Sequence, residues 1–202
     1  RRAHRSRGVN WLAHLRLSPP QPLLRLGNLA GDFVAGVDLA TLPAELQRGI
    51  AQHRAIDRFV DAHPVVVAAK ARFVPPHRRF AGVLLDVWFD HFLARDWAQH
   101  GDGRPLPQFL ADVHQDLRSH HELLPAPLQR VAPRFCADGW LEGYASVDGI
   151  ARVLGLMARR LTRPTPLAQG AELLRADYAA VERDFAALWP ELVAFTAASA
   201  PA

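Results

Sequence analysis

The chain has little of what several classes of protein need. Among its 202 residues Cys136 is the only cysteine, which excludes an intramolecular disulfide and a zinc or iron–sulfur site built from several thiolates. No apolar run approaches the roughly 18 residues of a membrane-spanning helix, so we expect no membrane association. Alternation of apolar and polar residues with a period of two is nearly absent, which argues against a β-sheet. With one thiol and no signal-like apolar region near its start, the chain is expected to be cytoplasmic.

Lysine is almost missing as well. The sequence carries 24 basic and 20 acidic side chains, a formal net charge of +4, yet Lys70 is its only lysine. A high-GC genome is the simplest explanation of this bias, although arginine also suits bidentate contacts with phosphate and carboxylate groups. The arginines are dispersed along the chain, which argues against nucleic-acid binding and leaves an acidic partner as the expectation.

Apolar residues recur at spacings of three and four, which predicts an all-α fold. A chain of this length can be stable without a disulfide or a structural metal, so residues 9–202 are expected to form a single-domain helical bundle. Residues 1–8 are expected to be a basic leader, disordered or not native, with the native start at Val9. The predicted helices cover residues 10–17, 22–36, 43–62, 64–73, 77–100, 106–121, 127–136, 139–143, 147–162 and 167–197.

Polar residues interrupt the apolar faces of these helices in pairs that are one helical turn apart. A buried carboxylate is costly unless it takes a proton, gains a partner or binds a cation, and four such helices point to one shared site. The pairs are Asn10 and His14, Asn28 and Asp32, His53 and Asp57, and Asp86 and Asp90.

Oxygen and imidazole groups make up this candidate site, and it has no sulfur. Such a set suits Mg²⁺, Mn²⁺ or Fe²⁺ better than a structural zinc. Facing helices of a bundle are a common source of such ligands. The candidate residues are Asp32, His53, Asp57, Asp86, Asp90 and His91.

Simpler roles compete for several of these residues. A lone buried histidine more often forms a core hydrogen bond than binds a metal, and this is the favoured interpretation of His14. Asn28 could brace a neighbouring helix, and Asp57 could orient a histidine instead of touching a metal. Arginine salt bridges are the weaker alternative for Asp86 and Asp90.

Four arginines lie near the carboxylates in sequence, at positions 54, 58, 78 and 79. Beside the site they would neutralise a phosphate group, and otherwise they form a solvated helix face. The sequence has no Walker loop, no G-x-S-x-G elbow, no dinucleotide-binding glycine motif and no H-E-x-x-H motif. The sequence therefore gives little support to a P-loop or dinucleotide-binding protein, an esterase with that elbow or a zinc protease of that type.

The polar pairs belong to a series of motifs spread over residues 10–97. In order they are Asn10-Trp-Leu-Ala-His14-Leu, Gly27-Asn28-Leu-Ala-Gly-Asp32-Phe, His53-Arg54-Ala-Ile-Asp57, Asp61-Ala-His63-Pro64, Arg78-Arg79-Phe-Ala-Gly and Leu85-Asp86-Val-Trp-Phe-Asp90-His91-Phe-Leu. This series resembles the acyl carrier protein phosphodiesterases. The resemblance departs from the family pattern at Gly31, where alanine is expected, and the Asp90-His91 order reverses that of ordinary HD-domain enzymes.

The resemblance implies an all-helical hydrolase that is distantly similar to the HD-domain phosphohydrolases. Enzymes of this family are metal-dependent, with manganese as the usual activator. They remove 4′-phosphopantetheine from the serine of holo-acyl carrier protein to give the apo protein. Because acyl carrier proteins are strongly acidic, the resemblance also supplies the acidic partner.

The working hypothesis gives each candidate residue a role. The metal ligands are expected to be Asp32, His53, Asp86 and Asp90. Proton transfer or ligand orientation is expected of Asp57 and His91. Arg54 is expected to steady the phosphate during catalysis, and the substrate-binding residues are expected to be Arg54, Arg78, Arg79 and Asn28. The alternatives are an HD-like phosphohydrolase acting on a nucleotide or another small phosphoester, and a non-catalytic helical binding module.

Overall fold

The computed structural model describes residues 10–137, 139–161 and 163–199, and within these ranges it holds helices and no strand. The all-α prediction is confirmed. The α-helices of the described residues are α1 (Trp11–Leu17), α2 (Pro22–Ala30), α3 (Ala44–Ala62), α4 (Pro64–Ala71), α5 (Ala81–Arg95), α6 (Trp97–His100), α7 (Leu106–Ser119), α8 (Ala126–Ala137), α9 (Val147–Arg160) and α10 (Gly170–Ala198). The short 3₁₀ helices are η1 (Gly31–Phe33), η2 (Leu39–Thr41), η3 (His77–Phe80), η4 (His121–Leu123), η5 (Glu142–Ala145) and η6 (Pro166–Gln169).

Two of the predicted helices are interrupted. The helix predicted over 22–36 passes into η1 at Gly31, and the chain then turns at Gly36, whose φ of 76° suits glycine. The helix predicted over 77–100 begins as η3 and breaks at Asp96, where φ is −104° and ψ is 30°. Both predictions were too long because apolar spacing continues through these breaks.

The helix predicted at 139–143 is wrong, since a turn leads there into η5. The last predicted helix is present as α10, which is longer than the other helices described here and bends at Asp177, where φ is −114° and ψ is 18°. The expected leader at 1–8 and start at Val9, as well as residue 162, lie outside the described residues.

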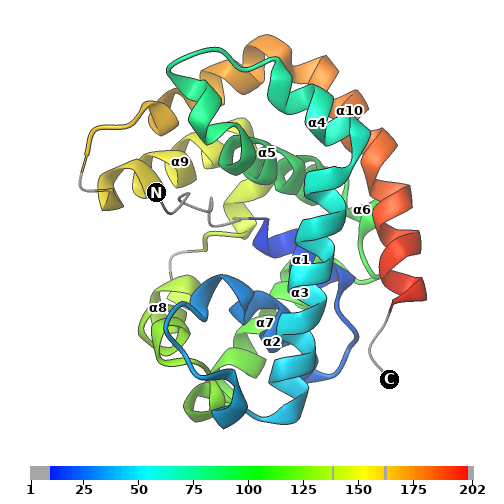
Figure 1. Cartoon of the computed structure of the whole chain (residues 1–202), viewed down its shortest axis with the longest axis vertical. Helices are drawn as coiled ribbons and strands as arrows, with labels where there is room; N and C mark the ends of the chain where they lie inside the picture. Colours follow the sequence, from blue (N-terminus) through cyan, green and yellow to red (C-terminus); the bar gives the residue numbers. More distant parts are fainter. Residues whose placement is uncertain (1–9, 138, 162, 200–202) are drawn as a thin grey trace.

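Helix α3 organises the molecule. Figure 1 shows it along the long axis, with α2, α7 and α8 around one end and α4, α5, α9 and α10 around the other. Helix α1 lies between these two groups. Side chains from α1 near the start to α10 near the end share one apolar core. Among the described residues, no helix combines the length and the apolar character that crossing a membrane would require.

Candidate functional site

Helix α1 carries His14 into the core. Its seven residues are too few for a helix that is stable alone, so tertiary contacts hold it. The backbone N–H groups of Leu12 and Ala13 donate to the two carboxylate oxygens of Asp90 on α5, each at 2.9 Å. These bonds satisfy amides that the first turn of a helix leaves without an internal partner. They fix the direction in which α1 presents His14, whose side chain is fully buried.

Two glycines set the distance between α2 and α3. A Cβ atom at Gly27 would lie 2.4 Å from the carbonyl oxygen of Leu46, and one at Gly49 would lie 2.2 Å from that of Leu24. Any larger residue would force the two backbones apart, because the atoms in the way belong to the main chain. The close crossing brings Asn28 of α2 against the polar face of α3.

Two imidazole rings and a carboxylate meet where α1 crosses α3. His14 Nε2 lies 3.3 Å from Asp57 Oδ1, and His53 Nε2 lies 3.2 Å from Asp57 Oδ2. The two rings stack with their centroids 4.0 Å apart and their planes at 20°. One nitrogen or oxygen from each residue lies within 4.8 Å of the others, so His14, His53 and Asp57 form a candidate metal-binding cluster.

Asp32 adds a second carboxylate near the same nitrogen of His53 that Asp57 approaches. Its Oδ1 lies 3.6 Å from His53 Nε2, and its Oδ2 accepts a hydrogen bond from Trp11 Nε1 at 2.9 Å. The site is therefore built from α1, η1 and α3. Of the cluster itself, Asp57 is the exposed member, with 40% of its side chain accessible, so the cluster opens to solvent on that side.

A chain of hydrogen bonds fixes the orientation of both histidines. Gln52 Nε2 donates to the carbonyl oxygen of Leu17 at 3.3 Å, which leaves Gln52 Oε1 to accept from Asn28 Nδ2 at 3.2 Å. The Asn28 Oδ1 atom must then accept from His14 Nδ1, at 2.7 Å. His53 Nδ1 donates to the backbone oxygen of Asn28 at 2.8 Å. Both imidazoles therefore carry a proton on Nδ1 and turn Nε2 toward the carboxylates.

The pKa values of the cluster reflect burial and mutual charge in the metal-free protein. Burial and the neighbouring His53 lower the pKa of His14, so its imidazole is neutral. Burial also opposes the charged form of His53, but its bonds to Asp32 and Asp57 outweigh that effect and raise the pKa of His53 to about 10. Burial would raise the pKa of Asp57, yet the neighbouring His14 and His53 imidazoles hold it well below the ordinary value.

These residues fit a divalent cation. The buried Nε2 of His14 has no hydrogen-bond partner, and its lone pair faces a carboxylate oxygen. Two acceptors in that position repel each other unless a cation lies between them. Ligand atoms on one ion with bonds of about 2.1 Å lie roughly 3 Å apart, similar to the separations found here. Imidazole nitrogen with carboxylate oxygen suits a first-row transition metal.

Comparison with known proteins gives the same family as the sequence motifs. Residues 9–192 match the family model described as acyl carrier protein phosphodiesterase. This chain belongs to the acyl carrier protein phosphodiesterase family. Relatives with that name include one from Yersinia pestis, 35% identical over 185 residues that cover 92% of this chain and 96% of the relative. One from Enterobacter sp. (strain 638) is 36% identical over 185 residues, which cover 92% of this chain and 96% of the relative. One from Salmonella dublin is 35% identical over 192 residues, which cover 95% of this chain and all of the relative. No solved structure matches.

Family membership confirms the resemblance drawn from the motifs. By its name the family consists of phosphodiester hydrolases, which is the enzyme class expected from the sequence. The aligned region includes every residue of the His14, His53 and Asp57 cluster. The cluster is thus the candidate active site of this member of the acyl carrier protein phosphodiesterase family.

Asp86 remains a candidate ligand beside the cluster. It is half-buried on α5. Burial, together with the negative charges of Asp57 and Asp32, raises the pKa of Asp86 to about 8, while the charge of Lys70 opposes that rise. The charges around the cluster therefore act on Asp86, although Asp86 is not one of the cluster's three members.

Asp90 and His91 take other roles in this structure. Both oxygens of Asp90 accept from the first turn of α1, so the carboxylate acts as an anchor for that helix and not as a member of the cluster. His91 Nδ1 donates to the backbone oxygen of Tyr144 at 2.8 Å, and its Nε2 lies 2.8 Å from the hydroxyl of Tyr178. Both its ring nitrogens are engaged away from the cluster, which argues against the proton-transfer role expected for His91.

The candidate arginines are exposed and lie on two elements, α3 and η3. Arg54 follows His53 directly on α3, with its side chain exposed. Arg78 is exposed on η3 and lines a pocket against α4. Arg79 places its guanidinium carbon 4.7 Å from the centre of the Phe80 ring. Only the first of these is adjacent in sequence to a member of the cluster.

His14 belongs to the site, which its sequence pattern alone did not predict. Its favoured interpretation was a structural histidine, whereas the structure joins it to His53 and Asp57. The available signal was the one-turn spacing of Asn10 and His14, which matches that of the other polar pairs. Spacing within one helix could not show that α1 crosses α3 at that point.

Proposed function

We propose that this protein hydrolyses the phosphodiester bond between 4′-phosphopantetheine and the serine of holo-acyl carrier protein, releasing the apo protein. The observation that carries the proposal is the His14, His53 and Asp57 cluster, buried beside Asp32 and opening to solvent at Asp57. Family membership supports a phosphodiester hydrolase, and the relatives' name gives the carrier protein as substrate.

We assign the metal ligands to His14, His53 and Asp57, with Asp32 and Asp86 completing the shell. Manganese is the proposed ion, and magnesium or iron(II) would also suit this donor set. A bound divalent ion would lower the pKa of a water and polarise the phosphoryl oxygens. Asp90, one of the ligands expected from the sequence, is left out because both its oxygens already accept hydrogen bonds.

The chain's own residues would hold the reacting groups in place. Asn28 fixes His14 and His53 through their Nδ1 atoms, so that both Nε2 atoms face Asp57 and the proposed position of the metal. Arg54 lies on the exposed side of α3, three residues before Asp57 and therefore near the opening of the cluster. Its guanidinium would donate to the non-bridging phosphate oxygens while water attacks phosphorus and the serine oxygen leaves.

Mass spectrometry of the carrier protein tests the proposal. Purified protein is incubated with holo-acyl carrier protein and Mn²⁺, and loss of the phosphopantetheine group is followed. The wild type and the surface control Arg130→Gln should release the group, whereas His14→Gln and Asp57→Asn should lose at least 100-fold in rate, an order-of-magnitude expectation for loss of a metal ligand. If the wild type leaves the holo-carrier intact but hydrolyses a nucleotide in a substrate panel, the small-phosphoester alternative is favoured. No Mn²⁺ binding at all would favour a non-catalytic binding module.

A further inference from the structure

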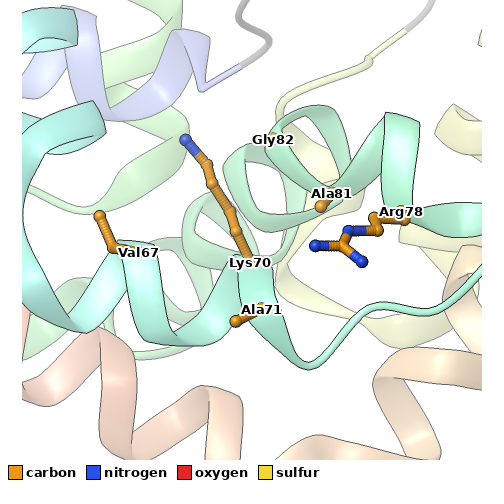
Figure 2. Close-up of a pocket in the computed structure, with 6 residues that line it drawn as sticks. All are labelled: Val67, Lys70, Ala71, Arg78, Ala81 and Gly82. Carbon is orange, nitrogen blue, oxygen red and sulfur yellow. The ribbon is translucent and has the colours of Figure 1, made fainter.

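A pocket between α4 and the start of α5 has no role in the proposal above. It has a volume of about 420 Å³ and is lined by Val67, Lys70, Ala71, Arg78, Ala81 and Gly82. In Figure 2 the guanidinium of Arg78 is directed toward the stem of Lys70, and the ammonium group lies at the far end of that stem. Pockets of roughly 300–1,000 Å³ suit small molecules and extended chemical groups, not whole protein helices.

Two short links along α3 and α5 connect the pocket with the residues of the proposed metal site. Lys70 Nζ bonds Asp61 Oδ1 at 2.6 Å, and Asp61 is one helical turn beyond Asp57 on α3. On the other wall, Gly82 is one turn before Asp86 on α5. The ammonium end of Lys70 therefore lies toward the cluster, and the positive charge of Lys70 acts on Asp86.

The walls combine small apolar groups with two cations. Ala71, Ala81 and Gly82 leave room for a chain to lie along the floor, and Val67 is apolar and exposed at the rim. The Lys70 ammonium bonds Asp61 through one N–H and keeps two more for a phosphate, while the five donors of the Arg78 guanidinium can reach carbonyl oxygens. A ligand with a negatively charged end, followed by a flexible chain that contains amides, would match the order of Lys70 and Arg78 along the pocket.

We propose that the pocket receives the phosphopantetheine arm of the carrier protein, with Lys70 at the phosphate end and Arg78 binding the amide carbonyl oxygens farther along. This inference rests on the proposed function and names the part of the substrate that the pocket recognises. It gives the single lysine of the chain a substrate-binding role. The carrier protein itself then contacts the surface around the opening of the cluster.

Direct binding of two free ligands, 4′-phosphopantetheine and pantetheine, tests this assignment in the Mn²⁺-loaded protein by titration calorimetry. Lys70→Gln should weaken phosphopantetheine binding about tenfold or more and leave pantetheine binding unchanged, because only the first ligand carries the phosphate. Arg78→Gln should weaken both ligands by a similar factor. Ala71→Leu, at an exposed position at the end of α4, should block both. Arg130→Gln on α8 is the matched surface control, and circular dichroism checks that each variant is folded.

The result that overturns the inference is phosphopantetheine affinity that is equal in the wild type, Lys70→Gln and Ala71→Leu. Weaker binding of the apo-carrier by these variants, with unchanged phosphopantetheine affinity, would also overturn it and would assign the two cations to acidic side chains of the carrier. Hydrolysis separates the two proposals. If the wild type releases the group and the Lys70→Gln and Ala71→Leu variants keep the same KM, only the binding role of the pocket is refuted. If the wild type binds the arm at this pocket but releases nothing, the proposed reaction is refuted.

Discussion

Replacing Asp90 by alanine should destabilise the protein even in the absence of metal. The substitution leaves the buried N–H groups of Leu12 and Ala13 without their acceptor. An unsatisfied buried donor costs about 1–3 kcal/mol, so the two together predict a loss of about 2–6 kcal/mol in the free energy of unfolding. Asp90→Asn keeps one acceptor oxygen and turns an amide group toward the other N–H, so about half of that loss is expected.

Urea unfolding in EDTA, followed by far-ultraviolet circular dichroism, measures the effect without a contribution from bound metal. For a chain of this size, each kcal/mol also lowers the Tm by about 2–4 °C. A metal ligand would behave in the opposite way, because its removal would spare the metal-free protein and abolish Mn²⁺ binding. The anchoring role is refuted if metal-free Asp90→Ala unfolds within about 0.5 kcal/mol of the wild type, the usual range for an inconsequential surface substitution.

Three further outcomes follow from the site. In EDTA, Asp86, with its pKa raised to about 8, should contribute a fall in stability as the pH rises from about 4 to about 8, because the folded protein resists its ionisation. His53, with its pKa raised to about 10, should contribute a further fall between about 6.5 and 10, while the lowered pKa values of His14 and His91 act in the opposite direction below about 6.5. Urea unfolding against pH, compared between the wild type and Asp86→Asn, isolates the contribution of Asp86, and equal slopes for the two proteins between about pH 6.5 and 8 would contradict the raised pKa of Asp86. Gly49→Ala should cost about 1–3 kcal/mol by forcing α2 and α3 apart and should weaken Mn²⁺ binding, and calorimetry showing neither change would disprove the tight crossing. Gln52→Leu should weaken Mn²⁺ affinity roughly 10–100-fold by releasing the amide chain that orients His14, and an unchanged affinity would show that this chain is dispensable.

The sequence predicted the fold class and two of the three cluster residues, His53 and Asp57, because those features are local. Spacing along α3 places His53 and Asp57 on one face whatever the helix packs against, and that prediction needs no tertiary information. The breaks at Gly31 and Asp96 were missed because apolar residues keep their helical spacing through both. Turn geometry and packing decided these ends, and neither leaves a mark in the pattern of apolar residues.

The rest of the site depends on how helices cross. Asp86 and Asp90 have the same spacing as His53 and Asp57, yet one faces the charges of the cluster and the other lies under the first turn of α1. Which end of α5 meets α1 is a property of the whole bundle. The same holds for His14, whose partners come from helices that only the assembled fold brings together.

The shortness of α1 has a consequence for how metal binding and folding are related. The helix is fastened at its first turn by Asp90 and carries His14 one residue beyond Ala13. An ion that binds His14 together with His53 would tie α1 to α3 and add its binding free energy to the local stability of α1. Loss of the ion would then favour local unfolding that begins at the N-terminal helix, with the apolar core between α5 and α10 still intact. The amides of α1 would exchange their hydrogens with solvent at a rate that reports how much of the protein carries metal.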